Sequence, residues 1–252
     1  MTKRKGILGV IVAVLVLGLC GAAPAALIAV PNSDFEQGSG TNPQDESAGW
    51  WTDSMQNGGT NSNGYLTGWV ITVPTYRFGG RWNPRDDHYA GATDPPGDPS
   101  PMDGPQAAFL HWGAGVSHSD STITSYQKVC DIEAGYDYTL TVAVGSSNGT
   151  AMGMVHKVEA IILADGVSVA TTDRVGPPSN GNWTELSVTM DAATATANAG
   201  KALKIQLFAK CYNQEKVHVD WDNVRLDKVP EPAAMSLLAL GGVGMLLRRR
   251  RR

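Results

Sequence analysis

The chain has 252 residues and a formal net charge of −4, with 24 acidic residues and 20 Lys or Arg residues. Eight of the basic residues lie at positions 3–5 and 248–252, and without them the charge of the remaining chain is near −12. Nucleic-acid binding requires a basic surface, so this acidic composition excludes that class of function. The roughly 200 residues between the two basic ends are enough for one domain with a sizeable core.

The first 26 residues have the three parts of a secretory signal peptide. Residues 3–5 are basic, residues 7–19 are apolar, and residues 21–26 are mostly small. This arrangement predicts a segment that is removed on export rather than a first membrane span. We expect cleavage after Ala25 or Ala26, with Ala29 as an alternative.

The first half of the exported part contains few segments that are typical of strands. Strands are expected at Ala29–Glu36, Gly68–Val73 and Ala107–Trp112. The intervening residues 37–64 and 77–106 are rich in Gly, Asn, Ser, Asp and Pro, which favour turns and loops. Loops of that length in a compact domain are usually functional or flexible.

The second half has a regular pattern of short strands. They are expected at Ser121–Val129, Tyr136–Gly145, Lys157–Ala164, Val167–Thr171, Trp183–Met190, Ala202–Ala209 and Val217–Leu226. Asp165-Gly166 is a hairpin turn signal. Residues 191–201 are rich in Ala and Thr, and we expect a loop there with at most one helical turn. Short strands with turn residues between them predict an all-β sandwich or barrel.

Short motifs along the exported part together resemble a known fold family. They are Asn32–Glu36, Gly68-Trp69, Trp82-Asn83-Pro84, Gln127, Gly135–Gly145, Ala164-Asp165-Gly166, Asn182-Trp183-Thr184 and Val217–Leu226. This set is similar to galactose-binding-like jelly rolls, especially the carbohydrate-binding modules for xylan and glucan. It also resembles the hapalindole-type cyclases, which share that fold. The resemblance implies a jelly-roll β-sandwich over residues 27–228.

The resemblance also implies a structural calcium ion. Glu36 ends the first expected strand and Asp222 lies in the last, and the terminal strands of such jelly rolls lie close together. Two carboxylates with nearby backbone carbonyls form the hard oxygen site that Ca²⁺ prefers. The alternative is that Glu36 is solvated and that Asp222 caps a neighbouring loop.

Aromatic residues in the loop-rich half are candidates for sugar binding. The ligand-binding candidates are Trp82, Asn83, Tyr89 and Trp112. Exposed aromatic rings stack on the apolar faces of sugars, while neighbouring polar groups bind the hydroxyls. The alternative for such residues is burial in the core, which we expect for Trp69.

Two cysteines, Cys130 and Cys211, remain after removal of the signal peptide. Both lie at ends of expected strands, and an oxidising compartment favours a disulfide between them. Two separate buried thiols are the alternative. The five histidines are scattered and do not have the spacing of a zinc site.

The sequence contains no recognisable catalytic motif. Asp86, Asp87, His88 and Tyr89 form a polar cluster that has acid and base groups, but adjacency in sequence does not make a catalytic site. Nucleophile elbows, phosphate loops and metalloprotease helices are absent from the sequence. We therefore expect that the protein is not an enzyme, with a cyclase-like or lyase-like activity as an alternative.

The last 24 residues form a three-part sorting signal. Val229, Pro230, Glu231 and Pro232 are followed by 15 uncharged residues and then by five arginines. Fifteen helical residues span roughly 22 Å, which is short for a bilayer core of about 30 Å. The arginines are expected on the cytoplasmic side. This order resembles the PEP-CTERM sorting domain, whose processing enzyme is the membrane transpeptidase exosortase.

Together these features predict an exported surface or matrix protein that is held transiently at the inner membrane by residues 229–252. We expect it to bind extracellular polysaccharide, with exosortase as its processing partner. A purely structural surface protein without a specific ligand is the main alternative.

Overall fold

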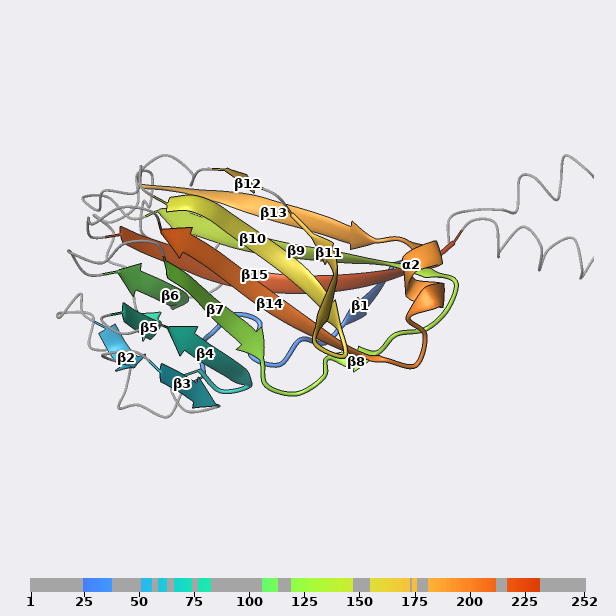
Figure 1. The fold of residues 1–252 in the computed structure, drawn as a ribbon, viewed down its shortest axis with the longest axis horizontal. Coiled ribbons are helices and arrows are strands. Elements are labelled where there is room, and N and C mark those ends of the chain that lie inside the picture. Colours follow the sequence, from blue (N-terminus) through green and yellow to red (C-terminus); the bar gives the residue numbers. More distant parts are fainter. Residues whose placement is uncertain are drawn as a thin grey trace, which may run out of the picture.

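The computed structural model describes residues 25–37, 51–55, 59–62, 66–73, 77–82, 106–112, 119–146, 155–172, 174–175, 181–211 and 217–231. These residues form two antiparallel sheets that pack face to face as a β-sandwich (Figure 1). The predicted all-β jelly-roll class is confirmed. Residues 233–252, where the sequence predicts an apolar helix, lie outside the described residues.

The first sheet has the strand order β13-β9-β15-β6-β5-β2, and β1 also pairs with β15. Its strands are β1 (Ala26–Ile28), β2 (Trp51–Met55), β5 (Arg77–Trp82), β6 (Ala107–Trp112), β9 (Tyr136–Ser146), β13 (Asn182–Met190) and β15 (Val217–Pro230). The long last strand β15 is therefore central, because β6 lies on one side of it and β9 on the other.

The second sheet has the strand order β11-β10-β14-β7-β4-β3. Its strands are β3 (Gly59–Ser62), β4 (Trp69–Val73), β7 (Ser119–Ser125), β10 (Val155–Ala164), β11 (Val167–Thr171) and β14 (Ala202–Cys211). Two short strands, β8 (Cys130–Asp131) and β12 (Arg174–Val175), pair with β14 and β10. The predicted hairpin between β10 and β11 is present, since Asp165 and Gly166 have φ values of 48° and 82°.

The main core lies between the two sheets and follows the two-residue period of the strands. On β14, Leu203, Ile205 and Leu207 are fully buried and belong to this core, whereas the intervening residues are partly exposed. On β15, Val219 and Trp221 point to the same core. Successive side chains of a strand face opposite sides, so the neighbours of these residues face away from the core.

A short helix, α2 (Ala192–Ala197), follows β13 where a loop was expected. Asp191 caps it, because its Oδ1 atom accepts a hydrogen bond from the Thr194 backbone N–H at 2.7 Å. This hydrogen bond lowers the pKa of Asp191. Ala192 and Ala195 bury one side of the helix, so tertiary packing stabilises a helix of only six residues.

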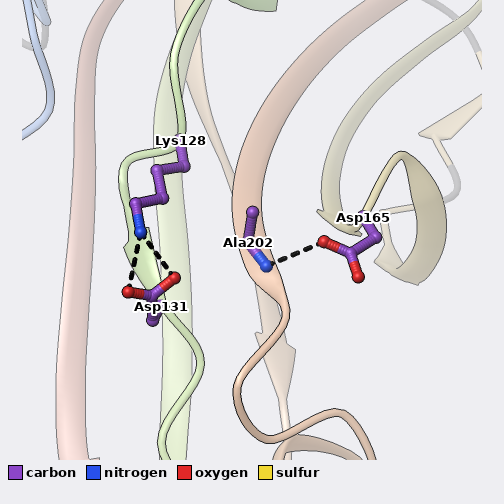
Figure 2. A network of polar contacts seen from close by, with 4 residues as sticks. All are labelled: Lys128, Asp131, Asp165 and Ala202. Atoms are coloured by element: carbon purple, nitrogen blue, oxygen red, sulfur yellow. Dashed lines mark hydrogen bonds and ion pairs between the residues drawn. The ribbon is translucent and has the colours of Figure 1, made fainter.

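Two polar contacts lie near the starts of β8 and β14 (Figure 2). Lys128 donates to both carboxylate oxygens of Asp131 at 2.8 Å, at the start of β8. Asp165 accepts a hydrogen bond from the Ala202 backbone N–H at 3.0 Å, which links the β10–β11 turn to the start of β14. These contacts hold the loops at the end of the sandwich that is far from β2 and β3 (Figure 1).

The structure corrects several expectations for the first half of the chain. The first strand is Ala26–Ile28 rather than Ala29–Glu36, and residues 31–34 form a turn. The expected loop 37–64 contains β2 and β3, and the expected loop 77–106 begins with β5. Glycine makes β5 resemble a loop, but a Cβ atom at Gly79 would lie 2.6 Å from Ile71 Cγ2 of β4. Close packing across the sandwich therefore requires glycine within this strand.

The predicted disulfide between Cys130 and Cys211 is wrong. Cys130 is a free thiol opposite Leu203, near the start of β14, whereas Cys211 ends the same strand. Eight extended residues separate the two positions by roughly 26 Å. A disulfide requires Cα atoms no more than about 7 Å apart. Both cysteines lie at strand ends, as predicted, but at opposite ends of the sheet.

Candidate functional site

A second buried cluster covers the face of the first sheet that is turned away from the main core. It contains Trp82 of β5, Ala107 and Phe109 of β6, and the partly buried Trp183 of β13. Ala108 and Leu110, which alternate with Ala107 and Phe109 on β6, belong instead to the main core. The first sheet is thus buried on both faces at this place.

The central strand β15 adds polar side chains to this face. His218, Asp220 and Asp222 alternate with the core residues Val219 and Trp221. The exposed fraction is 3% for His218 and 0% for both aspartates. Ionisable groups are rarely so deeply buried without partners, so their contacts indicate what the site does.

The strand register places Gly145 on one side of Asp220 and Phe109 on the other. Asp220 pairs with Gly145 of β9 and with Phe109 of β6, and Gly145 in turn pairs with Trp183. A Cβ atom at Gly145 would lie 2.8 Å from the Trp183 ring. The missing side chain at Gly145 is therefore what allows the Trp183 indole to lie over the sheet next to the position of Asp220.

A polar chain runs through the cluster from β5 to β6. The Trp82 Nε1–H donates to Asp220 Oδ1 at 2.5 Å. His218 Nε2 lies 2.7 Å from the same oxygen, and His218 Nδ1 lies 3.4 Å from His111 Nδ1. When Nε2 carries its proton, His218 donates to Asp220. A neutral His218 then presents Nδ1 as an acceptor towards His111.

Aromatic rings hold the His218 imidazole in one orientation. The Phe109 ring is stacked on it with centroids 5.2 Å apart and an angle of 10° between the planes. Trp82 and His111 meet it edge-on, with centroid distances of 4.6 Å and 5.5 Å. A buried acid–base pair with fixed geometry in apolar surroundings is suited to proton transfer.

The two residues expected to bind calcium lie near one bulge in β15. The bulge lies between Asp222 and Arg225, and the Val224 backbone N–H donates to the Ser33 carbonyl at 2.9 Å. That hydrogen bond joins β15 to the segment that leads to Glu36. Asp222 Oδ1 accepts from the Asn223 backbone N–H at 2.7 Å, where Asn223 has a φ of 50°.

The surroundings of Glu36 are polar and mostly buried. Glu36 Oε1 accepts from the Gln106 backbone N–H at 2.8 Å, and the Glu36 carbonyl accepts from Arg81 at 2.7 Å. Gln106 Oε1 is buried without a hydrogen-bond partner among the described residues. The described part of the chain contains no group of three or more His, Cys, Asp or Glu residues arranged for a metal ion. The donor set therefore fits a calcium ion only if backbone and amide oxygens complete it.

The predicted sugar-binding residues do not lie together on one described surface. Trp82 is 4% exposed and donates to Asp220, so it is part of the buried cluster rather than an exposed stacking surface. Trp112 ends β6 opposite Val217 of β15. Asn83, Asp86, Asp87, His88 and Tyr89 lie outside the described residues.

Sequence reasoning missed His111, His218 and Asp220. A signal was present, because residues 217–222 alternate apolar and polar side chains. Such alternation usually indicates a strand with one solvated face. The distinction between a solvated and a buried polar face depends on neighbours from β5 and β13, which are distant in the sequence.

The comparison with protein families decides the classification. The sequence matches the HpiC1-like family, described as HpiC1 cyclase, over residues 26–227. The chain belongs to the HpiC1 cyclase family. The expectation that the protein is not an enzyme is therefore overturned, because its family is one of cyclases. A search of the curated proteins found no match.

Solved structures of cyclases have the same fold as this member of the HpiC1 cyclase family. The Stig cyclase Fisc from Fischerella sp. TAU, in complex with (3Z)-3-(1-methyl-2-pyrrolidinylidene)-3H-indole, has a TM-score of 0.56 and 19% identity over 82% of this chain and 100% of that chain. An apo cyclase from Fischerella sp. has a TM-score of 0.57 and 19% identity over 82% and 98% of the two chains.

A carbohydrate-binding module from the β-sandwich superfamily is a more distant structural match. It has a TM-score of 0.44 and 11% identity, and it covers 67% of this chain and 61% of that chain. The two resemblances noted in the sequence, to cyclases and to carbohydrate-binding modules, are thus both found among solved structures. The match to the cyclases extends over more of the chain.

The C-terminal part of this HpiC1 cyclase family member is a PEP-CTERM protein-sorting motif, matched over residues 228–252. The protein is therefore exported and sorted to the cell surface by exosortase. Val229, Pro230 and Glu231 are within the described residues, and Pro232 is outside them. Among the described helices, none has the length and apolar character needed to cross a bilayer.

Proposed function

We propose that this protein is an exported cyclase that uses acid–base catalysis, with Asp220 and His218 as the proton-transferring pair. The observation that carries the proposal is the position of the fully buried Asp220, whose Oδ1 atom lies within hydrogen-bonding distance of both His218 Nε2 and Trp82 Nε1. The family supplies the type of reaction, and the cluster supplies groups that can perform it.

The proposed reaction is a redox-neutral ring closure. The acid form of the pair donates a proton to an unsaturated carbon or nitrogen of the substrate and creates a cation. A π bond of the same molecule attacks the cationic carbon and closes a ring. The conjugate base then removes a proton from the cyclised cation, so the pair returns to its starting state.

The aromatic residues have a defined part in this proposal. The Phe109 ring stacks on His218, Trp82 contacts it edge-on, and Trp183 packs against the same cluster. Aromatic rings stabilise cations that lie over their faces. Their apolar surroundings exclude water, which would otherwise capture the cation. Holding the His218 ring between Phe109 and Trp82 keeps the proton-transferring atoms at a constant position.

The substrate class that suits this site is a planar aromatic molecule with an unsaturated side chain. Structures of the related Fischerella cyclases contain indole compounds, including 4-(1H-indol-3-yl)butan-2-one. We extend that class to this chain because its own cluster is rich in aromatic residues around one acid–base pair. An exported enzyme would meet such a molecule in the cell envelope or outside the cell.

Binding of 4-(1H-indol-3-yl)butan-2-one to the mature domain would test the site. We expect this probe to quench tryptophan fluorescence and to raise the Tm, and we expect Trp82→Phe to weaken its binding at least about tenfold. The matched control is Trp69→Phe, because Trp69 is equally buried but belongs to the main core. Equal affinity of the Trp82→Phe variant and the parent would contradict the proposal.

Carbohydrate binding remains a second candidate, supported by the β-sandwich fold and the cell-surface address. Binding of xylan, glucan or other polysaccharides on a glycan array, with loss of binding in a Trp112→Ala variant, would favour it. Because Trp82 is buried, a sugar-stacking surface would have to consist of other aromatic residues. We also propose that the protein is anchored transiently in the inner membrane before exosortase processes it.

A further inference from the structure

The last strand of the sandwich and the first residues of the sorting motif are one continuous element. In β15, Val229 pairs with Asp137 of β9, and Pro230 pairs with Tyr136. The Glu231 backbone N–H then donates to the Gly135 carbonyl at 2.9 Å. Three of the four residues of the Val-Pro-Glu-Pro motif are therefore held by the folded domain.

Strand β1 supports the other flank of the same segment. Ala26, Leu27 and Ile28 pair with Lys228, Asp227 and Leu226 of β15. Figure 1 shows β1 beside β15 near α2. The strand that leads into the motif is thus enclosed by β9 on one side and by β1 on the other until Lys228.

Proline is compatible with this position for a geometric reason. Backbone N–H groups of consecutive strand residues point to opposite flanks. The Glu231 N–H points to β9, so the Pro230 nitrogen faces the flank of β1, whose pairing ends opposite Lys228. Pro230 therefore takes no hydrogen bond away from the ladder with β9.

Side-chain contacts of Lys228 reinforce the pairing. Its Nζ atom lies 2.7 Å from Glu133 Oε1 and 4.4 Å from the centre of the Tyr136 ring. Tyr136 is also the residue that pairs with Pro230, so Lys228 contacts the ring of the residue opposite the motif proline. We call Glu133, Gly135, Tyr136 and Lys228 the motif clamp.

We propose that the motif clamp sets the upstream limit of exosortase processing, so that the mature protein keeps Val229, Pro230 and Glu231 as the end of β15. Peptide bonds in exposed chain are cleaved in preference to bonds in a paired strand, which must first open locally. The Val229–Pro230 and Pro230–Glu231 bonds lie inside the ladder with β9. Among the described residues, the Glu231 carbonyl is the first one beyond the last hydrogen bond of this ladder.

The chemical step is a hydrolysis or a transfer. The amide bond between the carbonyl carbon of the last retained residue and the following nitrogen breaks. The carbonyl carbon bonds to water, which leaves a carboxylate, or to a primary amine, which leaves a new amide. The released nitrogen takes up the proton that the water or amine loses, and no oxidant or reductant is required.

The mass of the intact mature protein, purified from a host that carries an exosortase, tests this inference. We expect a C-terminal residue at Glu231 or beyond, as a free acid after hydrolysis or with an added mass after transfer. A mature form that ends at Val229 or Pro230 would overturn the proposal. The result is independent of any cyclase activity, because it concerns the processing of the chain alone.

Hydrogen exchange on the unprocessed chain provides a second test. We expect the Glu231 amide to be protected from exchange, and we expect Lys228→Met to increase its exchange rate at least about tenfold. The control is Lys204→Met, since Lys204 donates to the Tyr126 carbonyl on the other sheet. Exchange of the Glu231 amide at the rate of an unfolded peptide in the parent protein would show that the sheet does not hold the motif.

Discussion

His218 Nε2 lies 2.7 Å from Asp220 Oδ1, and both residues are almost completely buried on the same face of β15. Residues two apart on a strand share a face, so this contact is a consequence of local geometry. What makes it unusual is the apolar surroundings from β5, β6 and β13. The pair therefore contributes both to stability and, in our proposal, to proton transfer.

The first prediction concerns the Asp220→Asn substitution. It keeps the shape of the side chain and an acceptor for Trp82 but removes the carboxylate that faces His218. We expect loss of about 3 kcal/mol in the free energy of unfolding, because breaking one partner of a buried pair is costly. Urea denaturation measures this loss. The control Asp131→Asn, at an exposed pair with Lys128, should change stability by less than about 0.5 kcal/mol.

The same variant separates a catalytic role from a purely structural one. If Asp220 transfers protons, the Asp220→Asn protein should still bind the indole probe when folded but should lose turnover. Turnover unchanged in a folded Asp220→Asn variant would contradict the assignment of this pair. Near-ultraviolet circular dichroism would establish that the variant is folded.

The second prediction concerns Gly145→Ala. The new Cβ atom would lie 2.8 Å from the Trp183 ring, so either the ring or β9 must move. We expect a destabilisation of about 1–3 kcal/mol and a changed tryptophan emission spectrum. Gly200→Ala is the comparison, because a Cβ atom there meets nothing within 4 Å although its φ is 82°. Gly200→Ala should lose stability through backbone strain but should leave the tryptophan emission unchanged. An altered emission spectrum in both variants would argue against the contact between Gly145 and the Trp183 ring.

The third prediction concerns stability at alkaline pH. Burial raises the pKa values of the Cys130 thiol and the Tyr138 hydroxyl. Both groups lose their protons more readily in the unfolded chain. Below the pKa values of the unfolded chain, about 9.0 for the cysteine thiol, the stability linked to these two groups is fully present. This stability is lost as the pH rises through the higher pKa values of the folded protein.

Thermal unfolding measured from about pH 8 to about pH 10.5 checks this prediction. The Tm of the parent should fall over this range, and the fall should be smaller in a Cys130→Ser variant, whose hydroxyl does not titrate there. A Tm that is independent of pH up to about 10.5 would contradict the assignment. Alkylation of the denatured, unreduced protein would also show that Cys130 is a free thiol.

The fourth prediction concerns calcium. If Glu36 and Asp222 hold a calcium ion together with backbone oxygens, millimolar calcium should raise the Tm of the mature domain and a chelator should lower it. We expect the shift to disappear in Asp222→Asn and to persist in Asp227→Asn, which lies farther along β15. Identical melting curves with calcium and with chelator would show that the domain does not bind calcium.

The elements that were predicted correctly depend on local patterns. Short strand-like segments with turn residues between them indicated β9, β10, β13, β14 and β15, and Asp165-Gly166 indicated the hairpin between β10 and β11. The family resemblance to cyclases was also recognisable from short motifs. These features were predictable because turn conformation and side-chain period depend on residues that are close in sequence.

The errors involve contacts between distant segments. Gly79 and Gly80 made β5 resemble a loop, although packing of Gly79 against Ile71 requires a small residue there. The disulfide was expected from the compartment and from strand ends, but the register places Cys130 and Cys211 at opposite ends of β14. Trp82 was predicted to lie on an exposed surface. Its burial depends on its hydrogen bond to Asp220, which is 138 residues away and is not recognisable from the sequence around Trp82.

The sequence by itself determined the sorting motif, most of the strands in the second half and the acidic character of the domain. Each of these is a property of composition or of neighbouring residues. Only the tertiary structure decided that His218, Asp220, Trp82 and Phe109 form one buried cluster, and that the sorting motif continues a central strand. The physical reason is that strand order and register are set by long-range pairing, which brings β5, β6 and β9 together around β15.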